Sequence, residues 1–232
     1  MITRRPSSER GHADHGWLDT YHTFSFADYY DPAHLSFRAL RVINQDMVTA
    51  GNGFGAHAHS DMEIVTYVLE GALEHEDSMG NGSVMRPGDV QRMSAGSGVV
   101  HSEFNASQSE RVRFLQIWIV PARAGTDPSY EQKSFDAASA VNRLRPIVTP
   151  DGHDGSLHIG QNVSIYDAHL RNASSLTHEI EEGRHAWLQV IDGGVRVNGT
   201  ILSAGDGAAI SDETSVTISA DEDSHLLLFD LA

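Results

Sequence analysis

The chain has 232 residues, a formal net charge of −16 and no cysteine. This length is sufficient for one large or two small domains, and a composition of 40% apolar and 21% charged residues is typical of soluble globular proteins. The acidic charge repels phosphate backbones and anionic membranes, so nucleic acid and membranes are not expected as partners. The lack of cysteine excludes disulfides and thiolate metal sites.

No secretory signal or membrane-spanning segment is predicted. The strongest apolar run, 114–122, is short and is interrupted by Gln116 and Pro121. No apolar stretch follows the arginines near the start of the sequence. We therefore expect a cytoplasmic protein.

The first half of the chain has the pattern of an all-β domain. Residues 1–36 are rich in histidine, aspartate and aromatic side chains, and 22–26 alternates as a strand does. From residue 40, short apolar runs are separated by turns of glycine, asparagine and aspartate. The strands are expected at 40–43, 63–69, 90–93 and 113–120. Many short strands at near-regular spacing indicate a jelly-roll barrel or sandwich.

The second half repeats this pattern after a connector. Prolines and glycines mark residues 122–152 as the connector, with a short helix expected over 134–143. Strands are then expected at 164–170, 186–191, 194–197, 208–210, 216–218 and 226–229. The predicted organisation is therefore an N-terminal metal-binding domain at 1–121, a connector at 122–152 and a C-terminal domain at 153–232.

A weak internal repeat relates the two halves. Glu70-Gly71 matches Asp192-Gly193, and Pro87-Gly88-Asp89 matches Ala204-Gly205-Asp206. The same sequence offsets from these turns identify the positions in the second half that correspond to the histidines and the glutamate of the first half. Those positions hold Glu179, Glu181, Ile218 and Ala220, which do not form a comparable ligand set.

Two short pairs, His57-Ala-His59 and His101-Ser-Glu103, carry the predicted chemistry. Side chains alternate between the faces of a strand, so both members of each pair project to the same side. Two such pairs facing each other would offer three imidazoles and one carboxylate to one divalent first-row metal. Four protein ligands leave two positions of an octahedron open, which favours a reactive site over a closed structural one.

These residues resemble the motifs of a known family. The spacing of His57, His59, Gly71, Pro87-Gly-Asp89 and His101 resembles the two motifs of the cupin superfamily. The closer resemblance is to the pirin family, in a bacterial branch related to pirin-like quercetin 2,3-dioxygenases. It rests on residues 11–32, 57–71, 88–96 and 100–103. The resemblance implies an all-β bicupin with two facing jelly-roll β-barrels or sandwiches, joined by a short helical connector, with metal only in the first.

The ligands implied by the resemblance are His57, His59, His101 and Glu103. Glu63 remains a rival carboxylate, because strict alternation from His59 would also turn it inward. The expected cofactor is a single divalent transition metal. Iron is the expected ion, and nickel, copper, manganese, zinc and cobalt are the alternatives.

The resemblance implies a dioxygenase that cleaves the heterocyclic ring of flavonols such as quercetin with O2 and releases CO. The metal would bind the flavonol 3-hydroxyl as its anion, and Glu103, or as second choice Glu63, would take the hydroxyl proton. The expected partners are therefore a small-molecule flavonol and O2, and we expect a monomer. The alternative is a non-catalytic metal-binding regulatory or interaction protein, which the family permits although nothing in this sequence indicates a protein partner.

The other histidines have no comparable spacing. His12 and His15 are expected in a loop, because Gly11 and Gly16 flank them. We interpret a further set as surface or structural groups: His75, His153, His158, His169, His178, His185 and His225.

Overall fold

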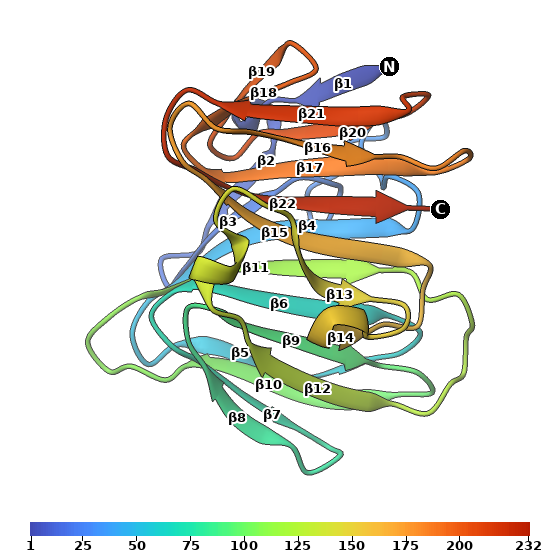
Figure 1. Cartoon of the computed structure of the whole chain (residues 1–232). Coiled ribbons are helices and arrows are strands. Elements are labelled where there is room, and N and C mark those ends of the chain that lie inside the picture. The colour runs from blue at the N-terminus through green and yellow to red at the C-terminus, as the bar shows by residue number, and fades with distance from the viewer. The chain divides into compact units, whose positions relative to one another are not determined.

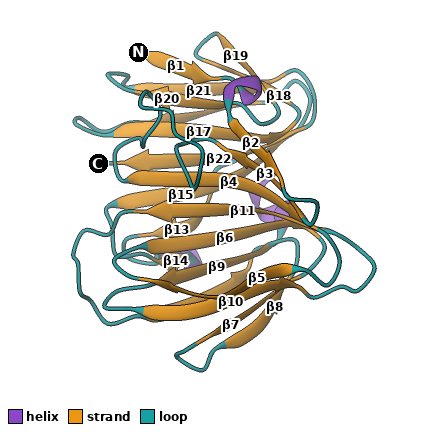
Figure 2. Ribbon diagram, turned by 180° about the vertical axis from the view of Figure 1, so that it is seen from behind, coloured by secondary structure: helices purple, strands orange, loops and turns teal.

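The computed structural model describes all 232 residues, and β-strands make up most of the chain (Figure 1). The helical content is limited to three 3-10 helices, each a single short turn (Figure 2). The sheets are antiparallel and open, so the all-β prediction is confirmed in its sandwich form. No helix is long and apolar enough to span a lipid bilayer.

Contacts divide the chain into two compact units, which we call unit 1 and unit 2. Unit 1 contains Met1–Arg10, Asp136–Ser156 and Asn162–Ala232, and unit 2 contains Gly11–Phe135 and Leu157–Gln161. The ranges 1–121, 122–152 and 153–232 remain the prediction for the domain limits. The contact grouping differs from them by placing the first ten residues with unit 1, by dividing the connector between the two units, and by placing Leu157–Gln161 with unit 2.

Unit 2 holds a seven-stranded sheet in the order β12-β9-β6-β11-β4-β3-β2 and a four-stranded sheet in the order β5-β10-β7-β8. The strands of this unit are β2 (Gly11–Asp14), β3 (Leu18–His22), β4 (Leu40–Val48), β5 (Gly53–His59), β6 (Glu63–Glu70), β7 (Leu73–Asp77), β8 (Gly82–Met85), β9 (Asp89–Ser94), β10 (Val99–Asn105), β11 (Val112–Ile119), β12 (Ser129–Ser134) and β14 (Leu157–His158).

Unit 1 repeats this arrangement. One of its sheets runs β1-β20-β17-β22-β15-β13, and the other is four-stranded in the order β16-β21-β18-β19. The elements are β1 (Ile2–Arg5), η1 (Ser7–Glu9), η2 (Ala137–Ala140), β13 (Arg145–Thr149), η3 (His153–Gly155), β15 (Val163–Leu170), β16 (Ser175–Glu179), β17 (His185–Asp192), β18 (Gly194–Val197), β19 (Thr200–Ser203), β20 (Gly207–Ile210), β21 (Ser215–Ala220) and β22 (Ser224–Leu231).

The equivalent turns explain the weak repeat in the sequence. Gly71 and Gly193 each follow a central strand with a φ near +75°, at 78° and 74°. A Cβ at Gly71 would lie 2.4 Å from the carbonyl oxygen of Arg111, and one at Gly193 would lie 2.4 Å from that of Asp223. Only glycine meets both the backbone conformation and the close approach, so both halves keep it.

Two local expectations differ from the structure. The strand expected at 22–26 instead ends at His22, and only an isolated bridge joins Phe26 to Tyr29. The helix expected over 134–143 is the short 3-10 turn η2, whose N-terminal Asp136 accepts a hydrogen bond from the backbone N–H of Ala138 at 2.9 Å. Apolar residues at helical spacing were too few here to extend the turn.

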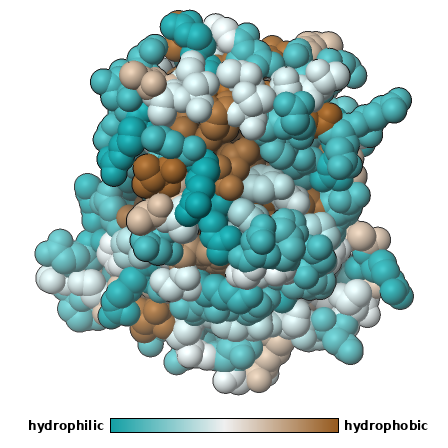
Figure 3. All heavy atoms as spheres, viewed as in Figure 1, coloured by the Kyte–Doolittle hydropathy of each residue, from teal (hydrophilic) through white to brown (hydrophobic).

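The two units use their interiors differently. The inner faces of unit 1 meet in one large cluster of buried aliphatic side chains, including Leu188, Ile218 and Leu228. Unit 2 has smaller clusters, one around Phe114 and one around Ile64. Hydrophilic side chains dominate the face of the molecule seen in Figure 3, in keeping with the acidic composition. The smaller clusters of unit 2 leave room for a cavity.

A buried carboxylate fastens the first strand to the rest of unit 1. Asp206 is fully buried in the turn before β20. It accepts hydrogen bonds from the backbone N–H groups of Ser203 (2.8 Å) and Ser7 (2.6 Å) and from Nε of Arg4 (3.0 Å). An ion pair to Nη2 of Arg4 (2.7 Å) completes the set. Because charged hydrogen bonds in a buried setting are strong, this residue determines how β1 joins the sheet.

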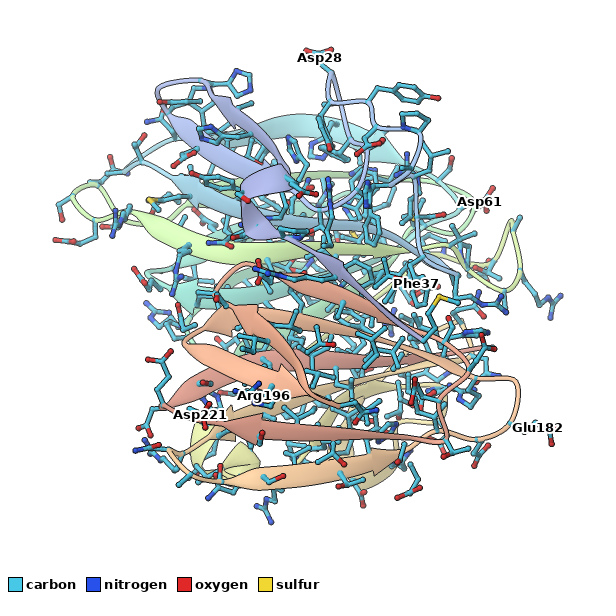
Figure 4. The ribbon with its side chains drawn as sticks, turned by 90° about the horizontal axis from the view of Figure 1, so that it is seen from above. Asp28, Phe37, Asp61, Glu182, Arg196 and Asp221 are labelled. Atoms are coloured by element: carbon cyan, nitrogen blue, oxygen red, sulfur yellow. The ribbon has the colours of Figure 1, made fainter.

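We expect Asp206→Ala to lower the free energy of unfolding by about 2 kcal/mol or more, because several donors lose a charged acceptor together. Equilibrium denaturation measures this loss. Asp221→Ala is the matched control: Figure 4 shows Asp221 beside Arg196 at the surface, and their ion pair is 3.7 Å long and exposed. The control should change stability by less than about 0.5 kcal/mol. Equal effects of the two substitutions would contradict this account of Asp206.

Candidate metal centre and its cavity

The register of β5 against β10 brings the two predicted pairs together. His57 lies directly opposite His101, and His59 lies opposite Val99. The register then shifts, so that Glu103 lies opposite Phe54. Gly53 permits the close approach at this end of the pair, because a Cβ there would lie 2.3 Å from the carbonyl oxygen of Glu103.

Three imidazoles converge at this point. The ring centroids of His57 and His101 are 4.4 Å apart, those of His57 and His59 4.8 Å, and those of His59 and His101 4.9 Å. One potential ligand atom from each ring lies within 4.8 Å of the others. This arrangement allows the three rings to coordinate one ion.

The hydrogen bonding of the rings suits metal coordination. Both ring nitrogens of His101 are buried without a hydrogen-bond partner. Nδ1 of His57 pairs with the carbonyl oxygen of Gly55 at 2.8 Å, which places the proton on Nδ1 and leaves Nε2 with a free lone pair. Burying an imidazole with two unpaired nitrogens costs free energy unless another group binds to one of them. A metal ion would bind in this way.

Burial keeps the rings of His59 and His101 neutral. It lowers the pKa of His59 to about 4, aided by repulsion from His57. Burial also lowers the pKa of His101 to about 3, with smaller contributions from the neighbouring histidines. Only neutral imidazole donates a lone pair to a metal, so the rings are in the binding form at neutral pH.

Glu103 lines the same cavity as the three histidines. It is buried, and its two carboxylate oxygens accept hydrogen bonds from Nε2 of Gln116 (2.7 Å) and Oγ1 of Thr66 (3.3 Å). Burial raises the pKa of Glu103 to about 7, although the hydrogen bonds from Gln116 and Thr66 oppose the rise. A carboxyl group with this pKa can hold or release a proton near neutrality.

The structure does not bring Glu63 into the cavity. It is buried at the start of β6, where it accepts a hydrogen bond from Oγ of Ser94 at 2.6 Å. The next residue, Ile64, lines the cavity, so Glu63 faces the other side of its strand. The alternation expected from His59 is interrupted between β5 and β6, where Asp61 has a φ of 50°. This turn reverses the expected direction of the Glu63 side chain.

The cavity has a volume of about 220 Å³ and a mostly apolar lining that includes Phe26, Phe54 and Trp118. His15 lies in the loop between β2 and β3, as predicted, and lines the cavity, whereas His12, also predicted in a loop, lies on β2. Nε1 of Trp118 is buried without a hydrogen-bond partner. The aromatic walls suit a planar small-molecule ligand.

Sequence reasoning missed a row of polar side chains on one face of the large sheet of unit 2. Backbone pairing aligns His22 with Asn44, Asn44 with Gln116, Gln116 with Thr66 and Thr66 with Gln91. His22 is hydrogen-bonded to Asn44 at 2.9 Å, and Oγ1 of Thr66 donates to Gln116 at 3.2 Å. Polar residues at alternate positions of an otherwise apolar strand were the available indication.

His75, predicted to be a surface or structural group, is buried and hydrogen-bonded. Its Nδ1 accepts from Nε2 of Gln91 at 3.3 Å, and its Nε2 lies 3.2 Å from Asp77. Its ring centroid is 5.3 Å from that of His101. His75 thereby forms part of the wall behind His101.

Two similar β-sandwich units, with a histidine cluster in unit 2, define a cupin-type protein of two domains. A model of the pirin family matches residues 3–119, and a model of the quercetinase C-terminal cupin domain matches residues 146–231. The chain belongs to the pirin family, as the sequence motifs predicted.

Relatives and solved structures agree with this assignment. The quercetin 2,3-dioxygenase of Escherichia coli K12 is 52% identical over 231 residues, which cover 100% of this chain and 99% of the relative. A putative quercetin 2,3-dioxygenase of Pseudomonas aeruginosa is 45% identical over the full length of both chains. The crystal structure of the E. coli bacterial pirin YhhW in complex with nickel(II) matches with a TM-score of 0.96 and 50% identity, covering 100% of this chain and 99% of that chain.

Asp46 is a second buried acid in this cavity, and its protonation should make the free energy of unfolding depend on pH. Burial raises its pKa to about 7, although a hydrogen bond from Thr20 opposes the rise. Between pH 4 and 7 the unfolded carboxyl is ionised while the folded one retains its proton, so unfolding releases a proton and stability falls as pH rises.

In chelator-treated protein, Asp46→Asn should remove this contribution to the pH dependence of the free energy of unfolding. The stability of the variant relative to the wild type should therefore rise by about 1 kcal/mol for each pH unit between 4 and 7. Denaturant unfolding across this range measures the difference. Asp221→Asn, at an exposed position, is the control and should show no such trend. A constant difference between Asp46→Asn and wild type would contradict the raised pKa.

Proposed function

We propose that this chain is a metal-dependent dioxygenase that opens the heterocyclic ring of flavonols such as quercetin with O2 and releases CO. The observation that carries the proposal is the convergence of His57, His59 and His101 in a cavity that also contains Glu103. The names of the E. coli and P. aeruginosa relatives support the same reaction class.

The residues that would hold the metal are His57, His59 and His101, with Glu103 as the fourth ligand. The unpaired nitrogens of His101 and the lone pair left on His57 fit this role. Three imidazoles and one carboxylate suit a divalent first-row ion. Iron remains the ion predicted from the sequence, and the nickel(II) complex of YhhW supports a divalent ion in this family.

When bound, the metal would act as a Lewis acid that lowers the pKa of the flavonol 3-hydroxyl and holds the reacting groups together. The protein would supply the base. Glu103, with a pKa of about 7, would take the hydroxyl proton, and the amide of Gln116 and the hydroxyl of Thr66 would orient its carboxylate. Glu103 would loosen its contact with the metal to do so.

The walls of the cavity would position the substrate. Phe54 and Trp118 offer aromatic faces and edges to a planar flavonol, and the apolar lining excludes bulk water from the anion. Both oxygen atoms of O2 would enter the ring-opened ester, and the excised ring carbon would leave with its oxygen as CO. The reaction therefore balances without an external reductant.

The proposed partners are a small-molecule flavonol and O2. We propose that the protein acts as a monomer. The net charge of −16 argues against nucleic acid as a partner. Cytoplasmic location remains a prediction from the sequence, and nothing in the sequence indicates a protein partner.

The first test removes a metal ligand. We expect His57→Ala to abolish quercetin turnover and to lower the metal content of this site, because the ion loses one of its imidazole ligands and the coordination geometry changes. Loss of the quercetin absorbance band, O2 uptake and CO release report turnover, and elemental analysis reports the metal.

His153→Ala is the matched control, since this exposed histidine pairs only with nearby residues around Asp151. It should leave both turnover and metal content at the wild-type level. Wild-type protein that binds metal but converts no quercetin with any divalent first-row ion would overturn the enzyme proposal. That result would favour the alternative, a metal-binding interaction protein.

The second test distinguishes the role of Glu103 as a base from its role as a metal ligand. Glu103→Gln keeps the shape of the side chain but cannot accept a proton, so we expect kcat to fall by about 10²-fold or more. The three histidines should retain the metal, as elemental analysis would show. Glu63→Gln is the control: Glu63 does not line the cavity, and its variant should keep kcat close to wild type. A larger loss of kcat in the Glu63 variant would reverse the assignment.

A further inference from the structure

A second histidine cluster lies in unit 1. Asp167 and His169 are two residues apart on β15, so their side chains project from the same face. His225 on β22 is the direct pairing partner of His169, and their rings stack with centroids 3.9 Å apart and planes inclined by 19°. Ala168, which lies between Asp167 and His169, and Leu226, which follows His225, belong to the core cluster of unit 1. The histidines therefore lie on the other face of the sheet.

The distances within this cluster match those between metal ligands. Nε2 of His225 is 2.8 Å from Oδ1 of Asp167, and Nε2 of His169 is 3.4 Å from Oδ2. Two ligand atoms at right angles around an ion lie about 3 Å apart when each bond is about 2.1 Å. One potential ligand atom from each of the three residues lies within 4.8 Å of the other two. Small movements of these side chains would accommodate an ion.

The charge of the cluster also calls for a cation. Asp167 is only 3% exposed, and its side chain contacts the two imidazoles. A buried carboxylate is stable only when it is paired. Protonating both stacked rings would place two like charges together, whereas one divalent ion would serve the carboxylate and both neutral rings.

The cluster is accessible from a pocket of about 340 Å³ within unit 1. Both histidines line it, and the short helix η2 forms another wall through Ala137 and Ala138. Asp192 also lines this pocket. The open side therefore leaves room for water or a further carboxylate to complete the coordination.

We propose that Asp167, His169 and His225 form a second divalent metal site, with two imidazoles and one carboxylate on one face of the ion. Nitrogen and oxygen donors of this kind suit zinc, nickel or cobalt, whereas calcium and magnesium prefer all-oxygen sites. This site belongs to unit 1 and does not depend on the proposed dioxygenase function. Val141 forms a bridge with His169, and the backbone N–H of Asn142 donates to the His169 carbonyl at 2.9 Å. A bound ion would therefore fix β15 where the connector meets it.

The test uses Co2+ with full-length, tag-free protein. The triple variant His57→Ala, His59→Ala, His101→Ala removes the first site and leaves the second cluster intact. We expect it to retain one Co2+ per chain by elemental analysis, with visible absorption bands of nitrogen and oxygen coordination. Adding His225→Gln to this background should abolish both the bound ion and the bands.

His153→Gln in the same background is the matched control, because His153 and Asp151 form an exposed pair without a third ligand. It should retain the ion. The proposal is overturned if the triple variant holds no Co2+ under conditions that load the wild type, or if its binding is unchanged by His225→Gln. Circular dichroism of each variant verifies folding, and the triple variant tests the site without altering the cluster itself.

A single His225→Gln substitution in the otherwise native chain separates this proposal from the dioxygenase proposal. We expect it to lose one of two Co2+ ions and to keep quercetin turnover. Loss of turnover with both ions retained would contradict the second site. Failure of the wild type to convert quercetin would leave the Co2+ result unaffected.

Discussion

The antiparallel pairing of β5 with β10 is the constraint on which the site depends. It sets His57 opposite His101, and the register shift beyond His101 places Glu103 opposite Phe54. A slip of one residue would turn every side chain of the slipped strand to the other face and disperse the cluster. Gly53 maintains this register because no larger residue fits against the backbone at Glu103.

The two units show how one topology can produce either a core or a cavity. The small sheet of each unit has the same order of strands, and β5 and β10 correspond to β16 and β21. In unit 1, Ile218 and its neighbours fill the interior with aliphatic side chains. In unit 2, imidazoles and carboxyl groups occupy inward positions and line a cavity. The cavity follows from this exchange of side chains within a common framework.

Keeping carboxyl groups in an apolar cavity lowers the stability of folded unit 2. Burial raises the pKa of both Asp46 and Glu103 to about 7. The polar row across the sheet limits this penalty, because Gln116 and Thr66 provide hydrogen bonds that the cavity wall would otherwise lack. The same hydrogen bonds hold the Glu103 carboxylate in a fixed orientation. A destabilised acid in a fixed orientation is the usual property of a residue that transfers protons.

The sequence by itself determined the all-β class, the repeat of two similar halves and the identity of the paired residues. Those features depend on alternation and on glycine turns, both of which act over a few residues and are therefore visible in the chain. His57, His59 and His101 could be grouped in advance because each pair lies on one strand.

Only the tertiary structure decided which other side chains reach the site. Glu63 was turned away by the backbone at Asp61, while Asp46 and Gln116 were brought into the cavity by the pairing of strands far apart in sequence. His169 and His225 became neighbours for the same reason. Strand pairing between distant segments is set by the packing of the whole sheet, and no local pattern records it.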